Sequence, residues 1–227
     1  MTDYKMEAAK AALQLIKRGQ TIGFGAGSTM QNMLHLIAKD IKLAESLTFV
    51  TSSSSTLELI YHYDFKFVNK VDGYHIDIYF DGCDQFDAQL NALKCGGGIH
   101  TSEKIMASFA DEFILVGDDS KYVKTLDTTY PLVLEVLPIG APLVYKWIQK
   151  NLPFKAFNTR KGTGKDGYVI TESGNYLIDI YFKEPVDLEK MNAVKMVPGV
   201  VEHSLFLGIA KKAIIAGEDG VRVLTPQ

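Results

Sequence analysis

The chain has 227 residues, of which 47% are apolar and 22% are charged, and its formal net charge is −3 at pH 7. This composition is typical of a folded globular protein and excludes an intrinsically disordered chain, and the length allows one large domain with a smaller companion. The mild acidity argues against a nucleic-acid-binding surface, which needs clustered lysine and arginine.

Two further features bear on cellular location. No apolar run approaches the ~18 residues that span a bilayer, and residues 1–10 lack the apolar segment of a secretion signal. The two cysteines, Cys83 and Cys95, are too few for a disulfide framework and indicate a reducing compartment. We therefore expect a cytoplasmic protein that binds neither a membrane nor a nucleic acid.

The first half of the chain alternates between helical and strand patterns. In chain order these predict a helix over residues 6–16, a strand over 21–24, a helix over 30–41, a strand over 47–51, a helix over 56–63, strands over 65–69 and 76–80, a helix over 102–110 and a strand over 113–117. The alternation predicts a mostly parallel sheet with helices on both faces. Because ligands of such sheets bind beyond the carboxyl ends of the strands, chemistry is expected in the segments that follow them.

The pattern changes near Pro131. The second half is predicted to contain a strand over residues 132–137, a helix over 142–150, a loop over 158–167, a hairpin of 168–171 with 176–182, and a short helix that Asp187 caps. Residues 213–216 and 221–224 return to the composition of buried strands. We therefore expect an α/β fold in which a domain of residues 1–129 plus 205–227 is interrupted by a smaller α+β domain of residues 130–204.

The first candidate site is a glycine-rich segment between a strand and a helix, with the sequence Gly-Phe-Gly-Ala-Gly-Ser-Thr at residues 23–29. Glycines let an anion approach the backbone, and a helix N-terminus supplies free N–H groups, so the segment suits a phosphate. It lacks the third glycine of the dinucleotide fingerprint and the Gly-Lys-Ser/Thr of a P-loop. A tight turn with a capping box from Ser28 to Gln31 explains the same pattern without a ligand.

The second candidate follows the strand of residues 76–80 and has the sequence Asp-Gly-Cys-Asp at residues 81–84, with Asp87 nearby. Paired carboxylates suit general acid–base catalysis or the binding of sugar hydroxyls. Asp-Gly is also typical of a plain turn, which the pattern alone favours. The five histidines are scattered, and no His/Cys spacing matches a ligand set, so no metal site is expected.

The third candidate is Lys-Cys-Gly-Gly-Gly at residues 94–98, followed by Glu103 in the first turn of a predicted helix. Consecutive glycines indicate close backbone approach, and Lys94 is suited to stabilising a developing oxyanion. Glu103 fits either a general base in a partly desolvated site or a favourable charge at a helix N-terminus. Cys83 and Cys95 are most simply small buried thiols.

A few charged residues give weaker signals. Lys121 follows another predicted strand end, after residues 113–117. Lys5, Arg160, Lys161 and Lys165 are most simply interpreted as solvated charges.

Taken together, these segments resemble ribose-5-phosphate isomerase type A. The resemblance rests on the three candidate motifs in their order, on Pro-Leu-Val-Leu-Glu-Val at residues 131–136, on Gly-Asn-Tyr-Leu-Ile-Asp at 174–179, and on Pro-Gly-Val-Val-Glu-His at 198–203 followed by Leu-Phe at 205–206. It covers nearly the whole chain. It implies a Rossmann-like domain of residues 1–129 plus 205–227 and an inserted ferredoxin-like domain of residues 130–204.

The resemblance also implies roles for individual residues. The general base falls on Glu103, the catalytic lysine on Lys94, and the sugar-contacting carboxylates on Asp81 and Asp84. The implied substrate-binding residues are Lys5, Ala26, Gly27, Ser28, Thr29, Gly82, Cys83, Cys95, Gly96, Gly97 and Lys121.

Four positions depart from the family pattern. Ala26 stands where the family often has a hydroxyl residue, Cys83 where it usually has alanine, and Gln85 where it usually has an acid. Cys95 stands where the family usually has glycine, so a positive φ there would strain the backbone. These departures bear on affinity and rate rather than on reaction type.

The implied function is the interconversion of D-ribose 5-phosphate and D-ribulose 5-phosphate through an enediolate, in the non-oxidative pentose phosphate pathway. The resemblance implies no cofactor, no metal, a small phosphorylated sugar as substrate, and a homodimer or homotetramer. Two alternatives remain: a non-catalytic sugar-phosphate sensor domain, for which the chain leaves no room for a helix-turn-helix module, and an amino-sugar-phosphate deaminase of related fold.

Overall fold

The computed structural model describes residues 2–68, 75–164, 166–185 and 187–227. In these residues the first elements are α1 (Tyr4–Leu13), β1 (Thr21–Phe24), α2 (Ser28–Ile37), α3 (Ile41–Ala44), β2 (Thr48–Thr51), α4 (Ser54–His62), β3 (Ile76–Asp81), β4 (Gln85–Phe86), β5 (Ala92–Leu93), α5 (His100–Phe109) and β6 (Ala110–Asp118). They are followed by η1 (Asp119–Lys121), β7 (Leu132–Val136), η2 (Pro138–Gly140), α6 (Ala141–Asn151), β8 (Phe154–Thr159), β9 (Tyr176–Phe182), α7 (Leu188–Ala193), η3 (Val194–Met196), β10 (Val200–His203), β11 (Leu205–Phe206), β12 (Lys212–Gly217) and β13 (Gly220–Leu224).

The largest sheet has six strands in the order β13-β12-β6-β3-β1-β2. Its neighbouring strands pair in parallel, except that β13 runs antiparallel to β12 at the edge. The predicted mostly parallel sheet is therefore confirmed. The carboxyl ends of β1, β3 and β6 meet at one edge of this sheet, where the predicted site segments begin.

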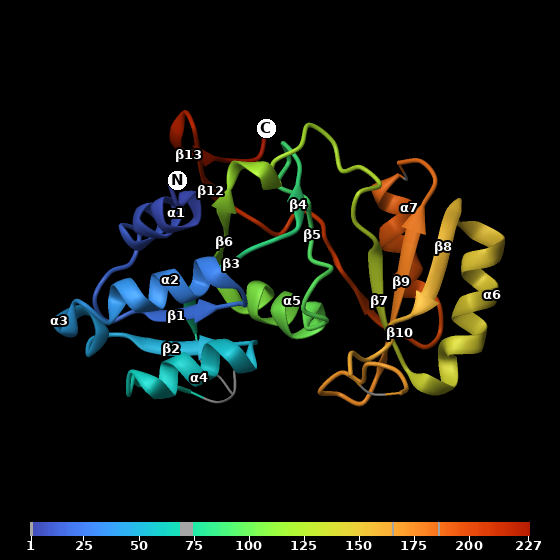
Figure 1. Cartoon of the computed structure of the whole chain (residues 1–227), viewed down its shortest axis with the longest axis horizontal. Helices are drawn as coiled ribbons and strands as arrows, with labels where there is room; N and C mark the ends of the chain where they lie inside the picture. Colours follow the sequence, from blue (N-terminus) through green and yellow to red (C-terminus); the bar gives the residue numbers. More distant parts are fainter. Residues whose placement is uncertain (1, 69–74, 165, 186) are drawn as a thin grey trace.

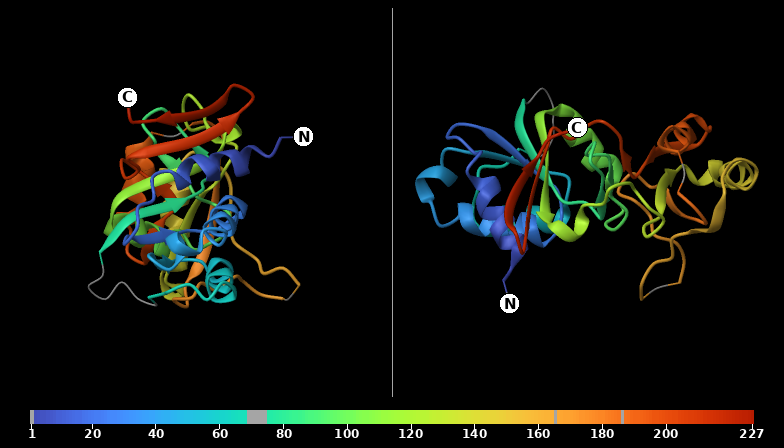
Figure 2. Two further views of the ribbon diagram at one scale, coloured as in Figure 1. Left: turned by 90° about the vertical axis from the view of Figure 1, so that its left-hand side faces the viewer. Right: turned by 90° about the horizontal axis from the view of Figure 1, so that it is seen from above.

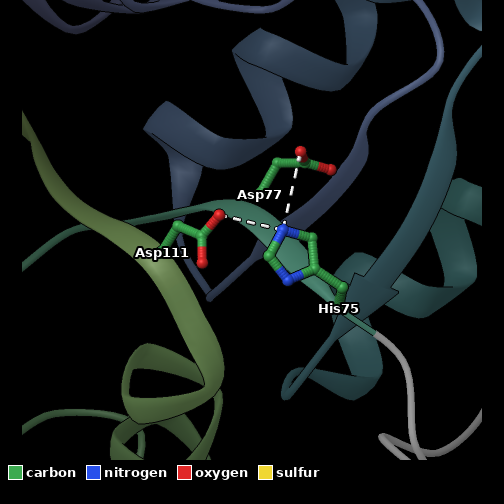
Figure 3. A group of neighbouring side chains, drawn as sticks. All are labelled: His75, Asp77 and Asp111. Atoms are coloured by element: carbon green, nitrogen blue, oxygen red, sulfur yellow. Dashed lines mark ion pairs between the residues drawn. The ribbon is translucent and has the colours of Figure 1, made fainter.

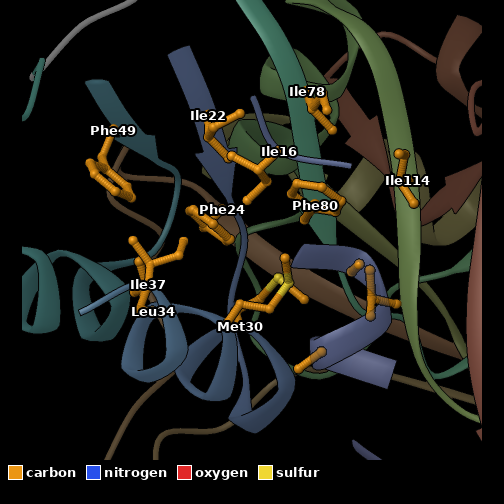
Figure 4. Close-up of a cluster of buried hydrophobic side chains, with 14 of the residues drawn as sticks. Ile16, Ile22, Phe24, Met30, Leu34, Ile37, Phe49, Ile78, Phe80 and Ile114 are labelled. Carbon is orange, nitrogen blue, oxygen red and sulfur yellow. The ribbon is translucent and has the colours of Figure 1, made fainter. Parts of the chain in front are cut away.

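The two faces of this sheet are covered differently. Helices α1 and α2 pack on one face, where Met30 and Leu34 meet Phe24 and Phe80 in a buried apolar cluster (Figure 4). On the other face, a second cluster includes Ala107 of α5 together with residues of the small sheet β11-β5-β4. Helices therefore cover both faces, as predicted, but one face shares its cover with an antiparallel sheet.

A second lobe is formed by β7–β10 with α6 and α7, and it lies beside the six-stranded sheet (Figures 1 and 2). Its strands are all antiparallel, in the order β10-β7-β9-β8, with α6 between β7 and β8 and α7 between β9 and β10. This βαββαβ arrangement is the ferredoxin-like order, as expected. Both chain termini lie on the other lobe (Figure 1).

Three local predictions in the first lobe need correction. The helix predicted over residues 30–41 is divided, because Asp40 caps α3 with its side chain and leaves Ile41 largely exposed. The strand predicted over 65–69 is reduced to one bridge between Phe67 and Phe49, and Asn69 lies outside the described residues. Strand β13 was predicted to be buried, but its valines are exposed because it forms the sheet edge.

In the second lobe the sequence prediction missed β8. The sequence predicts a loop at residues 158–159 and predicts that residues 168–171 pair with the following strand. The predicted hairpin is confirmed only at its closed end, where Ile170 forms an antiparallel bridge with Tyr176 and the Thr171 N–H donates to the Asn175 carbonyl. The rest of β9 pairs with β7 and β8, and Tyr168 forms an isolated bridge with Lys161. Strand β8 is half exposed at the sheet edge, so its apolar side chains do not alternate cleanly enough to signal a strand.

No helix in the described parts of the chain is both long and apolar enough to cross a bilayer.

Candidate active site

A cavity of about 350 Å³ opens at the carboxyl edge of the six-stranded sheet. Every site residue predicted from the sequence lines it, except Cys95. Those residues are Lys5, Ala26, Gly27, Ser28, Thr29, Asp81, Gly82, Cys83, Asp84, Lys94, Gly96, Gly97, Glu103 and Lys121. The structure thus brings together six segments of the chain, from Lys5 to Lys121.

The centre of the cavity is a buried cluster of Asp81, Lys94 and Glu103. Asp81 is the last residue of β3, Lys94 follows β5, and Glu103 lies in the first turn of α5. The Lys94 Nζ lies 2.8 Å from Asp81 Oδ2 and 3.4 Å from Glu103 Oε1, and it donates to the Gly82 carbonyl at 2.5 Å. One ammonium therefore joins two carboxyl groups in a site largely closed to water.

Burial changes the protonation of this cluster. Loss of solvation raises the pKa of Glu103 to about 8, with the Lys94 ammonium opposing the shift and the Asp81 carboxylate adding to it. Burial alone would lower the pKa of Lys94, but Asp81 and Glu103 outweigh it and raise that pKa above its usual value. Lys94 therefore remains a cation, while Glu103 can exchange a proton near neutral pH.

Asp81 is held in place by its neighbours. The Gly82 N–H donates to Asp81 Oδ1 at 2.7 Å, and the Tyr79 hydroxyl donates to Oδ2 at 3.1 Å. A Cβ on Gly25 would lie only 1.9 Å from the Asp81 carboxyl carbon. The glycine at position 25 thus makes room for this carboxylate, whereas the sequence suggested that the glycines of residues 23–29 serve an anion.

The other end of the cavity is the N-terminus of α2. Gly27, at φ +99°, precedes the helix and provides no side-chain cap, and Ser28 is the first helical residue. The capping box considered from the sequence is therefore absent. Lys5 Nζ donates to Ser28 Oγ at 3.4 Å, and Lys121 of η1 lines the same cavity. Free helix N–H groups beside two lysines are suited to binding a phosphate.

Asp84 is oriented by the glycine-rich loop of residues 94–98. Its Oδ2 accepts from the N–H of Cys95 at 2.6 Å and of Gly96 at 3.2 Å. Cys95 itself points away, donating its thiol to the Pro131 carbonyl, and its φ is not positive, so the expected strain does not occur. Asp87 belongs to a turn, where it accepts from the Gln89 and Asn91 amides, as the turn interpretation predicts.

Neither cysteine has the environment of a nucleophile. Burial raises the pKa of Cys83, which lines the cavity, to about 12, and burial also raises the pKa of Cys95. Both remain thiols at neutral pH, in agreement with their interpretation as packing residues.

Comparison with known proteins gives the same picture as the site geometry. A sequence model of the family described as "Ribose 5-phosphate isomerase A (phosphoriboisomerase A)" matches residues 48–220. The chain belongs to this family. Ribose-5-phosphate isomerase A of Bradyrhizobium diazoefficiens is 33% identical over 99% of this chain and 96% of its own length, and that of Methanocaldococcus jannaschii is 34% identical over 98% and 97%.

Solved structures of the family superpose closely on this chain. The enzyme of Methanocaldococcus jannaschii gives a TM-score of 0.89 at 32% identity, covering 98% of each chain. A D-ribose-5-phosphate isomerase in complex with phospho-erythronic acid gives 0.89 at 32% identity, covering 98% of this chain and 97% of its own. The enzyme of Plasmodium falciparum gives 0.88 at 31% identity. The α/β fold with its second lobe is thus the ribose-5-phosphate isomerase A fold.

Two of the departures from the family pattern have a structural account. Gln85 exchanges two hydrogen bonds with Asp127, one from its amide group and one to its amide oxygen, each of 2.9 Å. A carboxylate at position 85 would lack the donor for this pair. At Ala26 a methyl group lines the cavity beside the α2 N-terminus.

Sequence reasoning missed residues that act on this site from outside its motifs. Phe86 and Asp118 line the cavity without having been singled out. Arg160 was interpreted as a solvated charge, but it pairs with Asp179 and donates to the Cys95 and Gly96 carbonyls. No local pattern marks it, because its partners lie far away in the sequence. Lys161 is exposed, as predicted, and Lys165 lies outside the described residues.

One group with metal-ligand spacing occurs in the described residues, and it lies away from the cavity. His75, Asp77 and Asp111 approach one another at the amino ends of β3 and β6, opposite to the edge that carries Asp81 (Figure 3). His75 Nε2 lies 2.8 Å from Asp111 Oδ2, and His75 and Asp111 are exposed. These residues form a surface ion pair, so they take no part in the cavity's chemistry.

Proposed function

We propose that this chain interconverts D-ribose 5-phosphate and D-ribulose 5-phosphate through an enediolate. The observation that carries the proposal is the buried Lys94 ammonium between Asp81 and Glu103, in a cavity that ends at the α2 N-terminus. One end of the cavity suits a phosphate and the other provides an acid–base group beside a cation. A phosphorylated sugar that must gain and lose protons on adjacent carbons requires both.

The phosphate is placed at the N-terminus of α2. Ser28 and Thr29 offer backbone and hydroxyl donors, and Lys5 and Lys121 supply positive charge. Ala26 and Gly27 form the wall of this end of the cavity. Anchoring the phosphate fixes the distance from the anion to the carbons that react.

The sugar lies along the carboxylates. Asp81 and Asp84 bind its hydroxyl groups and assist opening of the furanose ring, while Gly82, Cys83, Gly96 and Gly97 shape the wall and Cys95 contributes through its N–H. Asp84 and Asp81 are both held by backbone N–H groups, so they remain oriented when the sugar arrives.

The reaction is a transfer of one proton between adjacent carbons. Glu103, as a carboxylate, removes the proton from C2 and later delivers it to C1, while the aldehyde oxygen at C1 gains a proton and the C2 hydroxyl loses one. Lys94 stabilises the negative charge of the enediolate. A pKa raised to about 8 by burial makes Glu103 a suitable base near neutral pH.

The decisive experiment is an isomerase assay with ribose 5-phosphate on the wild type and on Glu103→Gln. We expect Glu103→Gln to lower kcat by about a thousandfold or more while inhibition by inorganic phosphate is unchanged. Near-normal turnover in Glu103→Gln would remove Glu103 from the mechanism. Product formed in deuterium oxide should carry deuterium, and complete absence of exchange would contradict the enediolate.

We also propose that residues 1–129 plus 205–227 and residues 130–204 form the two domains, that the protein is cytoplasmic, and that it is a homodimer or homotetramer. The exposed apolar side chains of Leu137, Ile139 and Met196 support self-association. Leu137 donates to the Gly199 carbonyl, which brings these residues to one edge of the second lobe. Light scattering after size exclusion would measure the oligomeric state, and a monomer would refute it.

A further inference from the structure

We propose that Arg160 is a positioning residue for the reaction, which holds the loop of residues 94–98 and, through it, the carboxylate of Asp84. This inference rests on the proposed isomerase activity for its readout. Arg160 belongs to the second lobe and follows β8, while Asp84 lies at the carboxyl edge of the six-stranded sheet. Arg160 does not line the cavity itself. The second lobe therefore acts on the geometry of the cavity through the loop that Arg160 holds.

The guanidinium of Arg160 is fixed on one side by a carboxylate. Its Nη2 lies 2.6 Å from Asp179 Oδ1, and its Nε lies 3.1 Å from Asp179 Oδ2. Asp179 belongs to β9, and only 9% of its side chain is exposed. A paired, mostly buried guanidinium has little freedom to move, because leaving the carboxylate would strand a buried charge.

On its other side the same guanidinium binds two consecutive carbonyls of the loop. Nη2 donates to the Cys95 carbonyl at 2.8 Å and Nη1 donates to the Gly96 carbonyl at 3.0 Å. The N–H groups of these same two residues donate to Asp84 Oδ2. The loop is thus held between Arg160 on its carbonyl side and Asp84 on its N–H side.

The loop also packs directly on the second lobe. Gly98 has φ +72°, and a Cβ there would lie 2.6 Å from Leu177 Cδ1 and 3.4 Å from Arg160 Nη1. Lys94, at the start of the loop, is fixed through its N–H to the Ser204 carbonyl. Arg160 therefore completes the fixation of a segment whose first residue is the central cation of the cavity.

Lysine cannot reproduce this arrangement. A guanidinium presents five N–H donors in one rigid plane and can bind the carboxylate and both carbonyls at once, whereas an ammonium is a single point of contact. If Arg160 is lost, the loop carbonyls lose their donors and the N–H groups that orient Asp84 become free to shift. The phosphate end of the cavity is formed by the N-terminus of α2 and not by this loop, so it should keep its affinity.

The test compares Arg160→Met with the neighbouring control Lys161→Met, whose side chain is exposed. We expect Arg160→Met to lower kcat/KM for ribose 5-phosphate by about 10- to 100-fold, because small displacements of reacting groups have effects of this size. Inhibition by inorganic phosphate should not change, and Lys161→Met should match the wild type. Loss of phosphate binding in Arg160→Met would overturn the proposal.

A double-mutant cycle separates positioning from general damage to the fold. If Arg160 acts through Asp84, then adding Arg160→Met to Asp84→Asn should change kcat/KM by no more than about twofold. If Arg160→Met lowers kcat/KM by the same factor in the wild type and in Asp84→Asn, the proposal is overturned. An equal factor in the two backgrounds is what a smaller fraction of folded enzyme would produce. Should Arg160→Met fail to fold, Arg160→Lys carries the same cycle, with a smaller loss expected in the wild-type background.

Chemical rescue is a second measurement that distinguishes positioning from a purely structural role, because added guanidinium would not restore activity lost through a damaged fold. Guanidinium at a sub-denaturing concentration should restore part of the kcat/KM of Arg160→Ala and leave the wild type unchanged, and absence of rescue would contradict the geometry. An inactive wild type would instead refute the proposed function. An active wild type with a fully active Arg160→Met would refute only the role of Arg160.

Discussion

At the scale of single residues, the cavity depends on the placement of a few charges in a region that excludes water. Lys94 lies between Asp81 and Glu103, and each of these side chains is less than a tenth exposed. Low exposure strengthens every interaction among them and makes the carboxyl group of Glu103 more basic. Two predictions belong to this scale.

The first concerns pH. As the proposed base, Glu103 acts only when it is ionised, and its pKa is raised to about 8. We therefore expect kcat/KM to be low at acidic pH, to rise as the pH approaches about 8, and to level off above it. Burial is the main cause of the shift and the Asp81 charge adds to it, so Asp81→Asn should move the rising limb to lower pH. A rising limb near the usual pKa of a glutamate would contradict this environment. The pH profile of kcat/KM measures both effects.

The second concerns Gly25. Alanine there would place a Cβ 1.9 Å from the Asp81 carboxyl carbon, so the carboxylate and its contact with Lys94 must move. Gly25→Ala should lower kcat/KM by about a hundredfold or more, as expected for displaced catalytic groups. The neighbouring Ala26→Ser, which supplies a hydroxyl common in the family, should retain most of the activity. Normal kcat/KM in Gly25→Ala would show that Asp81 tolerates displacement.

At the scale of secondary structure elements, strand ends and helix starts decide where chemistry can occur. Gly27 leaves the N-terminus of α2 without a side-chain cap, and α5 places Glu103 in its first turn. The loop of residues 94–98 precedes α5 and contacts the second lobe through Leu177 and Arg160. Its three glycines are not equivalent, because only Gly98 combines a positive φ with close contact to a neighbour.

A prediction on stability follows from that difference. Gly98→Ala should lower the free energy of unfolding by about 1–3 kcal/mol, because it forces a side chain into the left-handed region and against Leu177. Gly97→Ala meets its nearest atom at 3.5 Å and has no positive φ, so it should cost less than about 1 kcal/mol. Urea unfolding of both variants measures the difference, and equal losses would refute this account.

The sequence predicted the site motifs better than the second lobe's strands. Residues 21–24 and 76–80 are mostly buried runs with a glycine soon after each, so the sequence predicts β1 and β3 nearly to the residue. Strand β8 was missed because it lies at an exposed edge, where burial imposes no clear period. Arg160 was missed for a related reason, since its partners are set by the pairing of β8 with β9.

At the scale of the whole molecule, the second lobe holds α5 as well as the loop. Lys104 donates to Glu202 Oε1 at 2.8 Å and to the His203 carbonyl at 2.6 Å, and Thr101 donates to the buried Glu135. These bonds join the helix that carries Glu103 to β7 and β10. The position of Glu103, the proposed general base, thus depends on contacts between the lobes.

This junction should make the fold sensitive to acid. Burial lowers the pKa of His203 from 6.5 to about 4. Between these two pH values the histidine is protonated in the unfolded chain but neutral in the folded one, so the free energy of unfolding decreases as the pH falls from about 6.5 to about 4. His203→Gln should flatten the fall of Tm between pH 6.5 and 4, whereas the exposed control His62→Gln should not. Burial also lowers the pKa of His100 to about 4, so this residue contributes to the acid sensitivity in the same direction. It is present in both variants. An unchanged pH dependence in His203→Gln would refute the role of this histidine.

The sequence by itself determined the α/β class, the order of the site motifs and the family, because buried strands and glycine turns leave local signals. It also marked Asp81, Asp84, Lys94 and Glu103 and the glycine-rich segments of the cavity, but not Asp118. Only the tertiary structure decided how these groups act together. The raised pKa of Glu103, the space that Gly25 leaves for Asp81 and the hold of Arg160 on the loop all arise between residues distant in sequence. Burial and contact distance are properties of the packed fold, and no local pattern encodes them.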